Sequence, residues 1–110
     1  MARPVYSKQL FAEEIVVGGV AVYEVPDAVT VVVRDIAVLI TPGTGSNATV
    51  TLTAAGIPFW TEGAPPQIPR YRHIEGRWVA PGPSELEATL ISTDTSATAY
   101  IYVSGYYLPS

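Results

Sequence analysis

His73 is the only histidine of the chain, and histidine is the side chain best suited to acid-base chemistry near neutral pH. A Ser-His-Asp triad would have to be built on it. The Gly-x-Ser-x-Gly segment, which presents the nucleophilic serine in one large class of hydrolases, does not occur in the sequence. We therefore expect His73 to have a surface or interface role, and we expect a protein that is not an enzyme and has no catalytic residues.

The carboxylates predict neither a metal site nor a cofactor site. Most of them are isolated and lack the close spacing of a ligand set, namely Asp27, Asp35, Glu62, Glu75, Glu85, Glu87 and Asp94. Glu85 and Glu87 would share one face of a strand, which leaves calcium binding as one interpretation and a solvated edge or a pair with arginine as the other. Because the chain has no cysteine, disulfides and thiolate metal sites are excluded.

Arg34 and Asp35 interrupt the most hydrophobic segment, residues 29–41. Neighbouring residues of a strand face opposite sides, so we expect the two charges not to pair with each other. One interpretation is a salt bridge to another subunit, because an unpaired buried charge is costly. The other is that one face of the strand is exposed to solvent at this point.

Four aromatic residues, Phe59, Trp60, Tyr71 and Trp78, could stack against sugar rings. Aromatic side chains also dominate ordinary packing because of their large area. The sequence therefore leaves two interpretations open: a glycan-binding platform, or anchors of the core and of a loop.

Composition favours a protein that loses surface to partners. Charged residues make up 15% of the 110 residues and hydrophobic residues 48%, and the mean hydropathy is +0.27; a typical domain has about 25% charged residues. The net charge of -4 argues against nucleic-acid binding. We expect a single domain, a homo-oligomer, and no secretory signal or membrane-spanning segment, since the longest apolar run, 29–40, is split by two charges.

Ten prolines and nine glycines leave no room for a long helix, so the segments between them are predicted to be strands. The predicted strands are residues 5–11, 14–17, 20–25, 29–41, 47–55, 71–79, 85–92 and 98–109. Residues 56–69 are predicted to form a long loop, residues 71–79 one strand or a hairpin, and residues 1–11 an N-terminal arm or an edge strand. About eight short strands predict an all-β fold, an antiparallel β-sandwich of jelly-roll type.

The segment 98–109 is apolar or aromatic on both faces. Alternation places Tyr100, Tyr102, Ser104 and Tyr106 on one face and Ile101, Val103, Gly105 and Tyr107 on the other. We expect the second face to contact the opposite sheet and the tyrosine face to contact the core or another subunit. The interface candidates of the whole chain are Tyr100, Tyr102, Tyr106, Tyr107, Arg34, Asp35, Trp60 and Trp78.

Three segments resemble small virion accessory proteins of tailed bacteriophages. They are residues 22–36 (VYEVPDAVTVVVRDI), 76–86 (GRWVAPGPSEL) and 99–108 (AYIYVSGYYL). In that group a Val-Pro element leads into a central strand, a W-V-x-P-G turn precedes another strand, and a V-S-G-Y strand ends the chain. Where the group commonly has a glycine after Val-Pro, this chain has Asp27 and Ala28.

The resemblance implies a β-sandwich that joins a phage particle after synthesis in the host cytoplasm. It favours a capsid decoration or cement protein that forms a symmetric oligomer, with a trimer as the first expectation, and that binds the major capsid protein or another virion protein. A tail or head-fibre accessory subunit and a carbohydrate-binding module are the alternatives. The shared motifs contain no catalytic residue.

Overall fold

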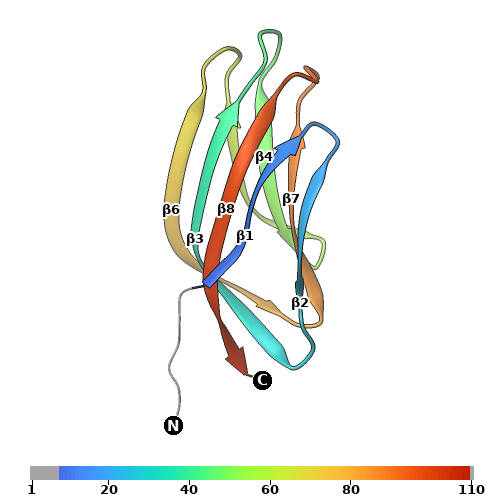
Figure 1. The fold of residues 1–110 in the computed structure, drawn as a ribbon, viewed down its shortest axis with the longest axis vertical. Helices are drawn as coiled ribbons and strands as arrows, with labels where there is room; N and C mark the ends of the chain where they lie inside the picture. Colours follow the sequence, from blue (N-terminus) through green and yellow to red (C-terminus); the bar gives the residue numbers. More distant parts are fainter. Residues whose placement is uncertain (1–7, 110) are drawn as a thin grey trace.

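The computed structural model describes residues 8–109, and this part of the chain is all β, with eight strands and no helix (Figure 1). The strands are β1 (Lys8–Val16), β2 (Val20–Val25), β3 (Val29–Thr41), β4 (Ala48–Ala54), β5 (Ile57–Ala64), β6 (Arg70–Pro81), β7 (Ser84–Ile91) and β8 (Thr98–Pro109). Within residues 8–109 there is accordingly no helix of the length and apolar character needed to cross a membrane.

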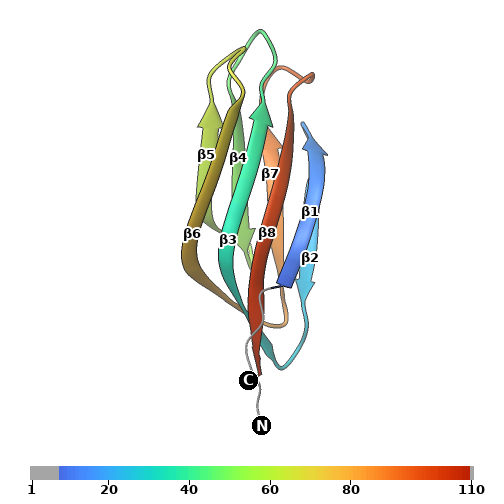
Figure 2. The same cartoon turned by 60° about the vertical axis from the view of Figure 1, so that its left-hand side comes forward.

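The strands form two antiparallel sheets of four that pack face to face. Their orders are β1-β8-β3-β6 and β2-β7-β4-β5, and Figures 1 and 2 show the first sheet lying in front of the second. The first strand pairs with the last, β2 with β7, β3 with β6, and β4 with β5. This nested pairing is the strand arrangement of a jelly roll, so the predicted antiparallel β-sandwich is confirmed.

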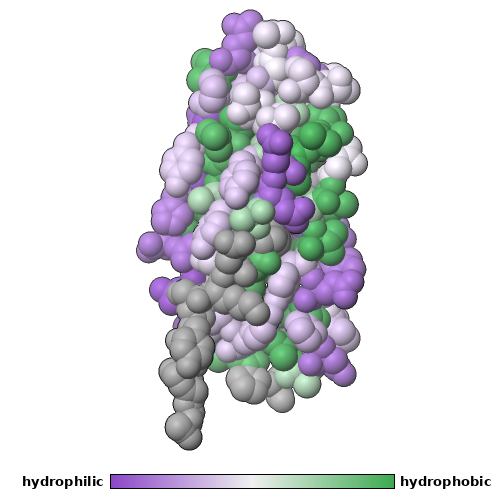
Figure 3. Space-filling view, in the orientation of Figure 1, coloured by the Kyte–Doolittle hydropathy of each residue, from purple (hydrophilic) through white to green (hydrophobic). Residues whose placement is uncertain are grey.

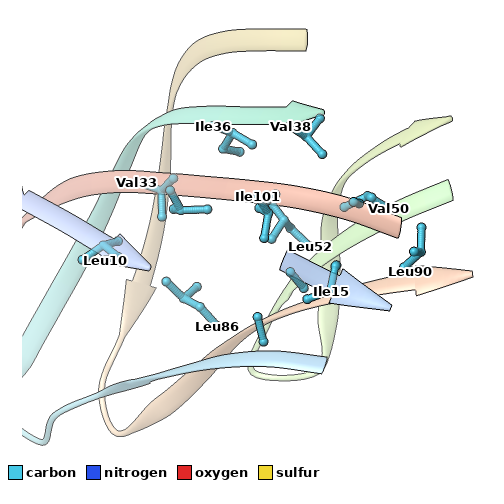
Figure 4. Packing of buried hydrophobic residues seen from close by; sticks show 14 of the residues in the cluster. Leu10, Ile15, Val33, Ile36, Val38, Val50, Leu52, Leu86, Leu90 and Ile101 are labelled. Atoms are coloured by element: carbon cyan, nitrogen blue, oxygen red, sulfur yellow. The ribbon is translucent and has the colours of Figure 1, made fainter. Parts of the chain in front are cut away.

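The core lies between the two sheets and consists of aliphatic side chains. Ile36, Val38 and Ile101 point inward from the first sheet and meet Val50 and Leu52 of the second, as Figure 4 shows. Each of these five side chains is at most 1% exposed. Full burial of such a side chain contributes about 1.5–3 kcal/mol, so this layer is the main stabilising element of the fold.

Two predicted features of the strand pattern are wrong: the break between residues 5–11 and 14–17, and the loop over residues 56–69. The predicted strands 5–11 and 14–17 are not separate, because β1 runs without a break from Lys8 to Val16 and absorbs only a register shift between Gln9 and Phe11. Of the two interpretations of residues 1–11, an arm or an edge strand, the structure shows an edge strand beside β8 from Lys8 onward, and residues 1–7 lie outside the described part of the chain.

The predicted loop 56–69 contains β5, which pairs with β4. Ala55 and Gly56 both have positive φ angles, 53° and 80°, as a two-residue hairpin turn of type I′ requires. Because β5 is an edge strand, Pro58 can lie in it without removing a hydrogen bond to a second neighbour. Residues 71–79 belong to the single strand β6 rather than to a hairpin.

The turn between β2 and β3 has a left-handed residue that is not glycine. Ala28 has a φ angle of 62°, and its backbone N–H donates a hydrogen bond of 2.9 Å to Asp27 Oδ1. A left-handed alanine costs about 1–2 kcal/mol relative to the right-handed form. Ala28 therefore stores backbone strain in the turn between β2 and β3.

Candidate functional site

A β-bulge at Arg34 in β3 creates the surface on which the candidate site lies. Val33 pairs with Gly105 of β8 and Asp35 pairs with Ser104, so Arg34 is an extra residue in β3. A bulge of this kind re-aims the side chains that follow it. Val33 before the bulge and Ile36 after it can therefore both point into the core, and both are fully buried.

The expectation that Arg34 and Asp35 face opposite sides is wrong, because the bulge places both on the outer face of the β1-β8-β3-β6 sheet. The guanidinium carbon of Arg34 lies 6.0 Å from the centre of the Tyr106 ring, a cation-π distance. Asp35 turns instead toward His73 of β6 and Ser104 of β8.

Three large apolar and aromatic side chains form a row across this outer face. Leu39 of β3 pairs in register with Tyr71 of β6 on one side and with Tyr100 of β8 on the other. Their exposed fractions are 66% for Tyr71, 44% for Leu39 and 49% for Tyr100. We call these three residues the aromatic row. Figure 3 views this side of the molecule, where hydrophobic residues lie among hydrophilic and intermediate ones.

A polar cluster lies farther along the same face, with His73 two residues from Tyr71 on β6 and Asp35 four residues from Leu39 on β3. His73 Nε2 is 3.3 Å from Asp35 Oδ1, and the Ser104 hydroxyl donates a hydrogen bond of 3.2 Å to Asp35 Oδ2. Glu75 pairs directly with Asp35 across the β3-β6 ladder. We call Asp35, His73, Glu75 and Ser104 the Asp35 cluster.

The Asp35 cluster does not have the order of a catalytic triad. In a triad the histidine lies between the serine and the carboxylate and takes the serine proton. Here the carboxylate lies between the other two residues, and Ser104 bonds to Asp35 rather than to His73. This arrangement orients the carboxylate and does not activate a nucleophile.

A shallow depression opens over part of this surface. It is lined by Asp35, Ala37, Tyr71, His73, Tyr102 and Ser104. The depression therefore joins the Asp35 cluster to the end of the aromatic row, and it leaves the carboxylate and the imidazole accessible to solutes.

The residues of β8 fall on both faces of the first sheet. On β8, Ile101 and Val103 are buried in the core and Tyr107 packs against it, as predicted. Tyr100, Tyr102 and Tyr106 lie on the outer face, so of the two predicted environments for the tyrosine face, core or subunit contact, the structure excludes the core of this chain.

The four aromatics considered for sugar stacking do not form one platform. Phe59, Trp60 and Trp78 are partly buried against the core, and the Phe59 and Trp78 rings contact each other with centroids 5.8 Å apart. Tyr71 lies on the outer face of the sheet instead. Phe59 and Trp78 line an apolar cavity of about 720 Å³ at the sandwich edge, together with Ile57, Val79 and Leu86.

Two arginines of β6, Arg70 and Arg72, link the two sheets at one edge of the sandwich. Arg70 Nη1 is 3.1 Å from Glu62 Oε2, and Arg72 Nε is 3.8 Å from Glu62 Oε1. Glu62 belongs to β5 of the second sheet, so these contacts bridge the two layers. Both arginine side chains are about half exposed (47% and 53%), which limits each pair to about 1 kcal/mol or less.

Sequence reasoning missed the Asp35 cluster because its members are far apart in the chain. The available signal was His73-x-Glu75, a spacing that places both side chains on one face of an extended strand. Nothing in the sequence pairs that face with Asp35, because that pairing depends on the register of β3 against β6 and on the bulge.

Comparison of the chain with known protein families and with curated proteins finds no match in either.

Proposed function

We propose that this protein is a structural subunit of a tailed-phage virion, and specifically a capsid decoration protein that assembles as a symmetric trimer and binds the particle surface. The observation that carries the proposal is the aromatic row, in which Tyr71, Leu39 and Tyr100 lie side by side and exposed on three adjacent strands. The reason for proposing a phage particle as the partner is the resemblance of residues 22–36, 76–86 and 99–108 to virion accessory proteins.

The physical basis of assembly is burial of this row against a neighbouring subunit. Removal of apolar surface from water contributes about 25 cal/mol per Å², and contiguous exposed apolar patches mark interaction sites. In a cyclic oligomer every copy uses the same surface for its contacts, and the aromatic row is confined to one sheet of each copy. The low charged fraction of 15% favours such contacts, because few charges would have to be desolvated.

A tail or head-fibre position would use the same surface on a different part of the particle. The carbohydrate-binding alternative has no comparable support, because Trp60 and Trp78 pack against the core. We therefore keep the tail role as the one alternative and let the experiment distinguish the two.

The test combines light scattering with co-sedimentation on purified phage capsids and tails that lack the protein. We expect the wild type to be oligomeric and to sediment with capsids. Leu39→Lys places a charge in the middle of the aromatic row and should weaken both association and capsid binding at least about tenfold, which corresponds to about 1.4 kcal/mol.

The matched control is Ile91→Lys, because Ile91 is also an exposed strand residue, 63% exposed, but lies on the other sheet. It should leave oligomerisation and particle binding unchanged. A wild type that is monomeric and binds neither capsids nor tails would reject the proposal. Binding to tails but not to capsids would replace the decoration role by the tail role.

A further inference from the structure

We propose that Asp35, His73 and Glu75 form a binding site for a divalent transition-metal ion of the Zn²⁺ type on the outer face of the β1-β8-β3-β6 sheet. His73 and Glu75 lie two residues apart on β6 and therefore share this face. Asp35 reaches it from β3, directly opposite Glu75 in the ladder, because the bulge at Arg34 turns its side chain outward. This inference does not depend on the role in a virion.

The distances match those between ligands of one metal ion. One nitrogen of His73 and one carboxylate oxygen each of Asp35 and Glu75 lie within 4.8 Å of one another. Two ligands at zinc bond lengths and a tetrahedral angle are about 3.3 Å apart. The distance from His73 Nε2 to Asp35 Oδ1 is 3.3 Å, longer than the roughly 2.7–2.9 Å of a charge-assisted hydrogen bond. Rotation of the exposed Glu75 side chain would bring its carboxylate oxygen to a similar distance from His73 and Asp35.

A neighbouring side chain orients the Asp35 carboxylate, as is usual for a metal ligand. The Ser104 hydroxyl donates a hydrogen bond to Asp35 Oδ2, which fixes the carboxylate and leaves Oδ1 directed at His73. Metal-binding carboxylates are commonly oriented by such an outer hydrogen bond. Ser104 is only 5% exposed, so its hydroxyl is held in place by the sheet.

Charge also favours a cation here. Two carboxylates directly opposite each other across a ladder repel, and this repulsion destabilises the pair. A divalent ion bound between the two carboxylates would attract both and so turn this repulsion into a net attraction. One imidazole nitrogen with two carboxylate oxygens suits Zn²⁺ and its transition-metal neighbours better than Ca²⁺ or Mg²⁺, which prefer oxygen ligands alone. The depression beside Tyr71 and Tyr102 leaves the remaining coordination positions to water.

The test is titration of the untagged, chelator-treated chain with ZnCl₂, followed by calorimetry and by the NMR signals of the histidine ring. Because His73 is the only histidine, its ring signals report the site without ambiguity. We expect one saturable site per chain with a change in the His73 signals. Glu75→Gln and Asp35→Asn should each weaken binding at least about tenfold, and Ser104→Ala by about 10–100-fold.

The matched control is Glu85→Gln, because Glu85 also faces a carboxylate, Glu24, across a ladder but has no histidine beside it. It should bind Zn²⁺ as the wild type does, and circular dichroism should show that every variant is folded. Absence of saturable binding in the wild type would overturn the proposal. So would unchanged affinity in Glu75→Gln and Asp35→Asn, which would leave His73 as a lone adventitious ligand.

Discussion

Gly105 of β8 lies where that strand passes the bulge of β3, and at this position only a hydrogen atom fits. A Cβ atom added there would collide with the Val32 carbonyl oxygen of the neighbouring strand. Since the clashing atom belongs to the backbone of a central strand, it cannot move aside as a flexible side chain would. The glycine of the V-S-G-Y segment is therefore required by the close approach of β3 and β8.

We expect Gly105→Ala to lower the free energy of unfolding by about 1–3 kcal/mol, the usual cost of overpacking. Urea denaturation at constant protein concentration measures the change. Gly63→Ala is the matched control, because Gly63 is also a strand glycine and an added Cβ there would meet its nearest atoms at 3.6–3.7 Å, an ordinary contact. Equal stability of Gly105→Ala and the wild type would show that β3 and β8 are not so closely packed.

Asp94 joins the β3-β4 and β7-β8 connections through its carboxylate. Oδ2 accepts a hydrogen bond of 3.1 Å from the Gly45 N–H, and Oδ1 accepts bonds from the Ser96 hydroxyl at 2.7 Å and the Ser96 N–H at 3.0 Å. These hydrogen bonds hold the pKa of Asp94 below its ordinary value of 3.8, and the bond from the Ser96 hydroxyl contributes most to the lowering.

The lowered pKa gives stability a defined pH dependence. Because the folded chain binds the proton less readily than the unfolded chain, Asp94 contributes its full stabilisation above pH 3.8 and loses it as the pH falls through the lower folded pKa. We expect Asp94→Asn to be less stable than the wild type at neutral pH and to lose less stability on acidification. Thermal unfolding of both proteins along a pH series checks this; parallel pH profiles would contradict it.

Among the elements, β8 is a central strand of the first sheet. It pairs with β1 on one side and with β3 on the other, and residues 106–109 continue the ladder with residues 29–32. Tyr107 also packs against the core. The apolar end of the chain is therefore an integral part of the sandwich.

We expect deletion of residues 106–110 to abolish cooperative folding. The truncation would expose the backbone groups of residues 29–32 on that side and uncover the core beneath Tyr107, and terminal residues held this way do not tolerate removal. Circular dichroism and urea denaturation of the truncated chain provide the measurement. A truncated chain that is soluble and unfolds cooperatively, with a midpoint close to that of the full chain, would show that the end of β8 is dispensable.

Strand prediction succeeded where β-branched and aromatic residues dominate a segment and failed where tertiary pairing overrode local signals. Residues 98–109 and 29–41 were predicted with the bounds that the structure shows, because β-branched and aromatic residues dominate both. The strand β5 was missed because Pro58 and Gly56 read as loop residues. An edge position and a hairpin turn accommodate both residues, but neither condition is visible before β4 is paired.

At the scale of the whole molecule, the distribution of charge determines how subunits could associate. The net charge is -4, so copies of the chain repel one another weakly at long range. The aromatic row contains no charged residue, whereas Arg34 and Asp35 lie on the same face and offer an ionic alternative for subunit contact. Apolar and ionic association respond to salt in different ways.

We expect association to be unchanged or strengthened when NaCl is raised from about 0.1 M to about 1 M, because screening removes the repulsion and leaves apolar burial intact. Sedimentation equilibrium at the two salt concentrations gives the association constants. A tenfold or larger weakening at high salt would instead assign the contact to ion pairs such as those that Arg34 and Asp35 could make, and Arg34→Ala would then be the variant that dissociates.

The alternation of side chains along each strand was enough to predict the fold class, the position of most strands and the inward face of β8. Three features appear only once the strands are paired: Arg34 and Asp35 share one face, Tyr71, Leu39 and Tyr100 form a row, and Asp35 meets His73 and Glu75. Each of these depends on the register between strands distant in the chain and on one extra residue in β3. Register is fixed by the packing of the whole core, which local sequence does not contain.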